Sequence, residues 1–276
     1  MYEIRLMSVI AIGAISLVGF GLPIASLLVL WRKFRGDLKL YFAGWLAAFA
    51  GSFLLMQILR NCLEVIPGAE TIQATPWLYG LCIAVLTVLV EEGARLWVFR
   101  LNLKNTREND YNAFVYAAGQ IGLLTLVVVG IGMSGNYPIA VSMYQGRAEI
   151  WLENLSGDAL VRAQEAFREI ADKPVGELWS LALEPIATMA VHMALSAVMW
   201  FGCKERKIGW KLVGATAGMR LVFEWVAEGM TATNLAPLAV QGVRLVMAAL
   251  CWIPAVKVWK ANHAEMPEEE PDDEAI

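Results

Sequence analysis

Several ionisable residues of this sequence stand inside long apolar stretches, where a charge is costly unless it has a partner or a function. They are Glu91, Glu92, Arg95, Glu184, His192, Arg220, Glu224, Glu228 and Arg244. A buried glutamate beside a histidine combines the residue types of a general base that activates a water molecule. The sequence therefore raises the hypothesis of a buried polar site that holds water and includes Glu91, Glu92 and His192.

Glu91 and His192 are predicted to lie at the same depth of a bilayer. Glu91 follows Trp77 by 14 residues, and His192 follows Trp179 by 13, each from the outer start of a predicted helix. A rise of about 1.5 Å per residue puts both about 20 Å below the outer surface. The same arithmetic puts Arg220, on a helix that runs outward, about 18 Å above the inner surface. We therefore expect Arg220 somewhat higher than the other two.

The same residues also fit a simpler pattern of internal ion pairs, and their spacing leaves both interpretations open. Arg220, Glu224 and Glu228 follow one another at intervals of four and so share one helix face. The expected pairs are Glu91 or Glu92 with Arg95, Arg220 with Glu224, and Arg244 with Glu224 or Glu228. For the outer layer of Glu184, Glu224 and Glu228 we expect ion pairs rather than catalysis.

The composition indicates which solvent surrounds the helices that carry these residues. Of the 276 residues, 58% are hydrophobic and 17% are charged, whereas soluble domains carry about 25% charged and 45–50% apolar residues. This predicts an all-α polytopic membrane protein and excludes disordered and coiled-coil classes. The net charge of -4 and the absence of a basic patch give no reason to expect a nucleic-acid partner. The four cysteines form no CxxC pair, so neither a disulfide framework nor a thiolate metal site is expected.

About seven segments have the length of roughly 20 apolar residues that a spanning helix needs. They are Met7–Trp31, Leu40–Leu59, Trp77–Val98, Tyr111–Met133, Trp179–Cys203, Ile208–Met230 and Leu235–Trp259. Lysines and arginines follow the first, third and fifth segments, whereas the loop from Leu63 to Pro76 has neither. Because cytoplasmic loops are enriched in these residues, the N-terminus is predicted outside and the C-terminus in the cytoplasm.

Two parts of the chain are predicted not to span the membrane: one segment within the transmembrane bundle of residues 1–259, and the tail that follows the bundle. The extracytoplasmic segment 134–178 contains Leu160, Ala163, Phe167 and Ile170 at helical spacing within Asp158–Asp172. We interpret this as an amphipathic helix that caps the bundle or lies on the outer surface. Residues 260–276 carry most of their charge as acid and are predicted to form a disordered cytoplasmic tail.

The charged residues also carry a resemblance to a known superfamily. Glu91-Glu92-x-x-Arg95 resembles the first motif of PrsW-type membrane proteases, and 112–119 resembles their second motif region. The stretch from Glu184 through His192 is similar to the helix with the first histidine of the superfamily, and particularly to its YhfC-type branch. The CAAX-prenyl and bacteriocin-processing (CPBP) proteases are related, as is the anterior-pharynx-defective subunit of gamma-secretase, a seven-helix assembly scaffold.

The sequence departs from this superfamily at two positions. The resemblance implies a glutamate on the fourth helix, but the candidate positions 121–126 contain no acid. It also implies a second histidine where Arg220 stands, and a permanent cation opposes a metal ion there. The resemblance allows zinc as a cofactor, with Glu92 and His192 as the ligands if a metal is present. Arg220 argues against it.

Three functions remain open from these residues. In the first, an intramembrane protease uses Glu91 or Glu92 to activate water, with His192 holding or relaying the proton. Arg95 would orient the carboxylates, Arg220 would stabilise an oxyanion, and Glu224 completes the candidate catalytic set. In the second, the same residues are structural ion pairs of a non-catalytic scaffold or subunit. In the third, the polar layer is the path of a channel or transporter.

The resemblance favours a divergent or catalytically impaired member that hydrolyses or binds membrane-associated polypeptides. The expected partners are membrane lipids and a membrane-protein substrate or partner subunit. The expected location is the cytoplasmic (inner) membrane of a bacterium.

Overall fold

A computed structural model describes residues 4–106, 108–204 and 209–263, and these residues form helices and loops without a strand. Long helical runs coincide with the predicted apolar segments. They are α1 (Leu6–Arg32); α2 (Leu38–Ala47), η1 (Ala48–Leu55) and α3 (Met56–Val65); α5 (Pro76–Thr87), η2 (Val88–Glu92) and α6 (Gly93–Thr106); α7 (Asn112–Leu124), η3 (Thr125–Ile131), α8 (Gly132–Ser134) and α9 (Asn136–Tyr144); α11 (Val175–Lys204); α12 (Trp210–Ala232); and α13 (Pro237–Asn262). Shorter helices are α4 (Ala69–Gln73), the 3₁₀ turn η4 (Ala148–Trp151) and α10 (Gly157–Asp172).

Five of these runs are long and apolar enough to cross a membrane: 6–32, 38–65, 112–144, 175–204 and 237–262. They confirm the all-α membrane bundle. The runs 76–106 and 210–232 are not among these five. They carry five of the charged residues, namely Glu91, Glu92, Arg95, Arg220 and Glu224. The number of seven spanning helices and the outside position of the N-terminus remain predictions.

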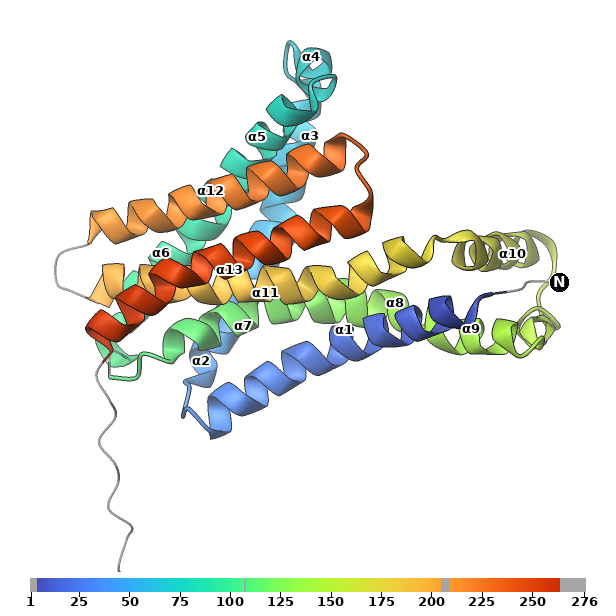
Figure 1. The fold of residues 1–276 in the computed structure, drawn as a ribbon, viewed down its shortest axis with the longest axis horizontal. Coiled ribbons are helices and arrows are strands. Elements are labelled where there is room, and N and C mark those ends of the chain that lie inside the picture. Colours follow the sequence, from blue (N-terminus) through green and yellow to red (C-terminus); the bar gives the residue numbers. More distant parts are fainter. Residues whose placement is uncertain (1–3, 107, 205–208, 264–276) are drawn as a thin grey trace, which may run out of the picture.

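Helix α11 lies at the centre of the bundle and is the most buried of the five apolar runs. It packs along α13 over most of its length, and it also contacts α1, α7 and α12 (Figure 1). The second half of α11 supplies a core that includes Trp200, which forms edge-to-face contacts with Phe99 of α6. His192 stands in the middle of this central helix and is therefore fully buried.

Helices α2 and α7 approach each other through glycine. A Cβ atom at Gly119 would overlap the carbonyl oxygen of Tyr41, and one at Gly44 would overlap the carbonyl oxygen of Tyr116. Small residues of this kind let membrane helices pack backbone against backbone. The close contact brings α7 and η1 towards the centre of the bundle.

Three of the long runs contain π-helical turns, η1, η2 and η3, and the first two of these contact each other. Wide turns of this type interrupt an α-helix rarely and are frequent at functional sites. η2 ends with Glu91 and Glu92, and η1 contains Ser52. The two irregular turns therefore meet where the charged residues gather.

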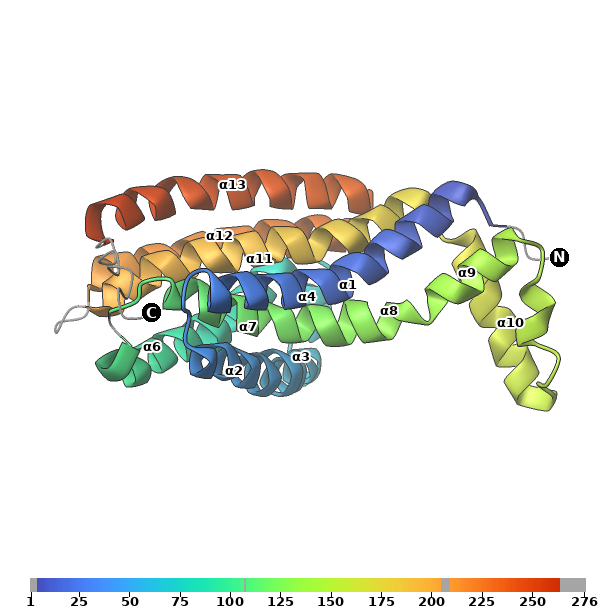
Figure 2. The ribbon, with the colours of Figure 1, turned by 90° about the horizontal axis from the view of Figure 1, so that it is seen from below.

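The predicted outer segment begins with helix rather than loop, because the fourth run continues past Met133 to Tyr144. α10 covers Gly157–Asp172 and lies with α9 at one end of the molecule, beyond α12 and α13 (Figure 2). Phe167 and Ile170 of α10 are buried against the apolar end of the bundle, while Leu160 and Ala163 are half-buried. Most of the predicted acidic tail, residues 264–276, lies outside the described residues.

Candidate functional site

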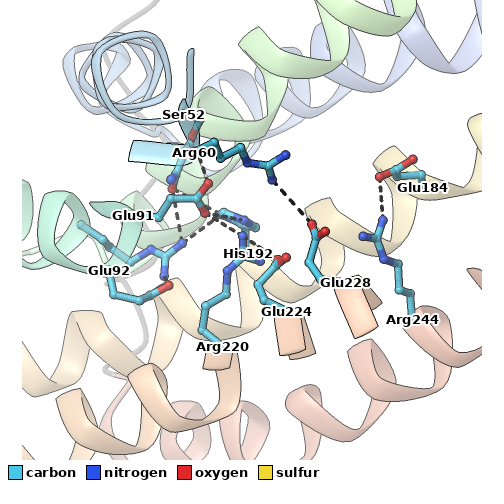
Figure 3. Close-up of polar contacts among 12 residues, drawn as sticks. Ser52, Arg60, Glu91, Glu92, Glu184, His192, Arg220, Glu224, Glu228 and Arg244 are labelled. Atoms are coloured by element: carbon cyan, nitrogen blue, oxygen red, sulfur yellow. Dashed lines mark hydrogen bonds and ion pairs between the residues drawn. The ribbon is translucent and has the colours of Figure 1, made fainter. Parts of the chain in front are cut away.

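The structure brings all six candidate site residues together from three of the long helical runs. Figure 3 shows five of them: Glu91, Glu92, His192, Arg220 and Glu224. Each is buried: Glu91 is 7% exposed, Glu92 4%, Arg95 0%, His192 0%, Arg220 3% and Glu224 8%. Glu91, Glu92 and Arg95 come from η2 and α6, His192 from α11, and Arg220 and Glu224 from α12. Burial at membrane depth makes every unpaired charge costly, so the pairing of these groups decides what they do.

Glu91 is the meeting point of three elements. Its Oε2 accepts a hydrogen bond from Arg220 Nη2 at 2.6 Å and lies 3.5 Å from His192 Nε2. Its Oε1 accepts a hydrogen bond from the Ser52 hydroxyl at 2.9 Å. Glu91 and His192 are thus in contact, as residues at a common level can be. The long side chain of Arg220 reaches the same carboxylate from α12.

Arg95 organises the opposite side of the histidine. Its guanidinium pairs with Glu92, one helical turn away, as the sequence predicted. Its Nη2 also donates to His192 Nδ1 at 2.9 Å and to Gln120 Oε1 at 3.3 Å. Because a guanidinium only donates, Nδ1 must accept, and the proton of a neutral His192 then resides on Nε2, facing Glu91.

Arg220 completes the network as a bridge between two acids. Its Nη2 lies 2.6 Å from Glu91 Oε2 and 2.9 Å from Glu224 Oε1. The second contact is the predicted pair at a spacing of four residues. One guanidinium therefore pairs with a carboxylate of its own helix and with one from η2, and it ties α12 to the run 76–106.

Two outer ion pairs differ from the sequence-based expectation. Arg244 pairs with Glu184 at 2.6 Å, rather than with Glu224 or Glu228. The reason is that α13 packs mainly against α11, so Arg244 faces the helix that carries Glu184. Glu228 has Arg60 at 3.7 Å instead.

The sequence analysis missed Gln120 and Ser52 as members of the site. Gln120 is 1% exposed, and its Oε1 lies 3.3 Å from both Arg95 Nη2 and His192 Nδ1. It stands one position before the stretch 121–126 in which an acid was sought, so an amide faces His192 from α7. A glutamine inside the apolar run of α7 could have been recognised in the sequence as a site residue. Ser52 could not, because serine is common in membrane helices.

A second polar cluster, also missed, lies at the C-terminal end of α11. Asp110 is 2% exposed and accepts from Lys204 Nζ at 2.6 Å and Trp200 Nε1 at 2.9 Å. His263 Nδ1 is 3.1 Å from its other oxygen. This carboxylate joins the loop before α7 to the ends of α11 and α13.

Comparison with known proteins identifies the family of the chain. The family model described as YhfC intramembrane metalloprotease matches residues 18–236, which is most of the chain. The chain belongs to this family. The "uncharacterized membrane protein YhfC" of Bacillus subtilis (strain 168) is 26% identical over 195 residues, covering 69% of this chain and 73% of that protein. No solved structure matches.

Membership in the YhfC family confirms the YhfC-type resemblance and the integral membrane character of the protein. The description of the family implies a metal ion, and the donor set of this chain can be tested against one. Structural and catalytic zinc sites take at least three nitrogen, oxygen or sulfur ligands from the protein. Among the described residues, no group of three or more His, Cys, Asp and Glu side chains is placed to hold a metal ion.

The neighbours of His192 also fit a metal poorly. A histidine that binds a metal normally donates its other ring N–H to a carboxylate, carbonyl or water. Here Nδ1 instead receives a hydrogen bond from Arg95, and Glu91 on the other side is already paired with Arg220. The residues present therefore do not fit zinc, and no cofactor is established.

Proposed function

We propose that this YhfC-family protein binds membrane-embedded polypeptide segments without cleaving them by metal-activated water. It would thus be a catalytically impaired member of the family. The observation that carries the proposal is the bridge from Arg220 to Glu91 and Glu224. A carboxylate that a guanidinium neutralises is a weak base, so Glu91 is poorly suited to take a proton from water.

An apolar groove beside the site supports a role in binding. It encloses about 560 Å³ between the run 38–65 and the run 76–106. Small residues form one wall, with Ala47, Ala50 and Gly51 among them, and Val90 and Trp97 belong to the other wall. Gly51 precedes Ser52 and Val90 precedes Glu91, so the groove adjoins the polar site. Small residues permit close approach of another helix within a bilayer.

The partner implied by this surface is an apolar segment of a membrane protein that enters sideways from the lipid. The cytoplasmic membrane of a bacterium is the proposed location, with the C-terminus in the cytoplasm. In a scaffold or subunit role, the same groove would bind the apolar segment of a permanent partner. Metal-free hydrolysis, with Glu91 as base and His192 beside it, is the alternative that the close approach of Nε2 to Oε2 favours.

The test compares the membrane proteins that co-purify with the parent chain and with three variants. Ala50→Trp fills the groove, Val246→Trp adds the same bulk on an exposed face of α13, and His192→Ala removes the imidazole. We expect an intact partner with the parent, with Val246→Trp and with His192→Ala, and none with Ala50→Trp.

The lengths of the co-purified proteins decide between binding and hydrolysis. Mass spectrometry should find the partner at full length, whichever residue occupies position 192. Partner fragments that accompany the parent chain and disappear with both His192→Ala and Glu91→Ala would instead establish hydrolysis. Equal recovery with Ala50→Trp and Val246→Trp would refute the groove as the binding surface.

A further inference from the structure

Glu91 and His192 keep the mutual distance of two ligands of one zinc ion. Zinc lies about 2.0–2.2 Å from histidine nitrogen and carboxylate oxygen in tetrahedral sites, so two such ligand atoms are about 3.3–3.5 Å apart. His192 Nε2 and Glu91 Oε2 are 3.5 Å apart. Nε2 is buried and makes no hydrogen bond in the described structure. Two potential zinc-ligand atoms therefore lie at the mutual distance that a zinc ion requires.

Arg220 contributes a positive charge at the place where the metal would supply one. Its Nη2 is 2.6 Å from the same Oε2 that faces His192, and it also contacts Glu224. A guanidinium has no lone pair for a metal and is always protonated in proteins. It attracts and joins acids from two helices, as a bound cation would, and it repels a second cation.

Arg95 weakens metal binding in a different way, through the tautomer of His192. Because Nδ1 accepts from Arg95, the nitrogen that faces Glu91 carries the proton and has no lone pair free for a metal. Gln120 Oε1 already lies 3.3 Å from Nδ1. If Arg95 were replaced, this oxygen could accept the N–H of Nδ1 and free Nε2 for coordination.

We propose that Arg95 and Arg220 together replace the metal ion of this family's site, and that a latent zinc site is preserved beneath them. The native protein is metal-free at this site. The two guanidiniums hold η2, α11 and α12 together by charge. The inference deepens the metal-free part of the proposed function, but its readout, zinc content, is separate from polypeptide binding.

The experiment measures zinc in full-length protein purified from cells grown with zinc. The parent chain should carry no more zinc than its His192→Ala variant. The double variant Arg95→Gln/Arg220→His should bind about one zinc per chain through Glu91, His192 and the introduced histidine. Addition of His192→Ala to the double variant should abolish binding. In the single variant Arg220→His, affinity should be about 10- to 100-fold weaker, because Arg95 still donates to Nδ1.

Two controls separate charge removal from ligand creation and from misfolding. Arg220→Gln removes the charge without adding a ligand and should bind no zinc. If the double variant is unstable, Glu224→Gln is added to it, because that acid loses its partner when Arg220 is replaced. Zinc should then raise the thermal midpoint of this triple variant and leave that of the parent unchanged.

The results that would overturn the proposal are equally specific. Stoichiometric zinc in the parent chain, lost on His192→Ala, would mean that the arginines move aside for the metal. A folded double or triple variant that binds no zinc would mean that no ligand geometry is preserved.

Discussion

Arg220 Nη2 lies 2.6 Å from Glu91 Oε2, although the two residues are 129 positions apart in the chain. Both side chains are almost completely buried, at 3% and 8% exposure. This contact joins α12 to η2 in the middle of the bundle and leaves Glu91 without the freedom of an unpaired base. It is the relationship on which the chemistry of the site depends.

Replacement of Arg220 by alanine is expected to destabilise the fold strongly, because Glu91 and Glu224 would both remain buried without a cation. Breaking a buried pair in this way costs about 3–5 kcal/mol. The control is Arg244→Ala, whose partner Glu184 has a side chain 45% exposed, so its loss should cost about 0–1 kcal/mol. Unfolding of the two variants in the same detergent gives the comparison. Equal losses would contradict the central role of Arg220.

The close contact of α2 and α7 predicts that Gly119 tolerates no side chain. Gly119→Ala would press a methyl group against the carbonyl oxygen of Tyr41, and overpacking of this kind costs about 1–3 kcal/mol. Gly214→Ala is the matched control, since nothing lies within 4 Å of a Cβ at that position of α12. There, alanine should leave stability unchanged or raise it, because glycine is the poorer helix former. A thermal midpoint that is lower for Gly214→Ala than for Gly119→Ala would refute the contact.

Asp110 is expected to hold the ends of α11 and α13 against the loop before α7. Asp110→Ala leaves the indole of Trp200 and the ammonium of Lys204 without their acceptor. Loss of these hydrogen bonds should cost about 3 kcal/mol. Glu108→Ala, in the same loop but exposed, should change stability by less than about 0.5 kcal/mol. Chemical denaturation measures both variants, and a small effect of Asp110→Ala would show that the cluster contributes little to the fold.

The predicted orientation can be tested by labelling single cysteines in intact cells. In a background with Cys62→Ser and Cys82→Ser, whose two remaining native cysteines are buried, Glu165→Cys on α10 should react with a membrane-impermeant maleimide. A cysteine at Asn262, at the end of α13, should react only after the membrane is opened. Both positions are exposed, so accessibility depends on the side of the membrane. The reverse pattern would place the N-terminus in the cytoplasm.

Local patterns in the chain were sufficient to predict part of the site. Glu92 with Arg95 and Arg220 with Glu224 are neighbours on one helix, and a spacing of three or four residues brings such side chains together in any α-helix. The common level of Glu91 and His192 followed from counting residues along two helices that run in the same direction. The membrane bundle itself followed from apolar length and low charge.

Contacts between helices needed the tertiary structure. Arg244 meets Glu184 and not Glu224 or Glu228, and the residue of α7 that faces His192 is Gln120 rather than an acid. Counting residues gives depth along one helix, but it says nothing about the rotation of that helix or the neighbour its face meets. Those are decided by packing, such as the close approach of Gly119 to Tyr41. Packing also set Arg220 against Glu91, which turned a set of catalytic residue types into a network closed by two arginines.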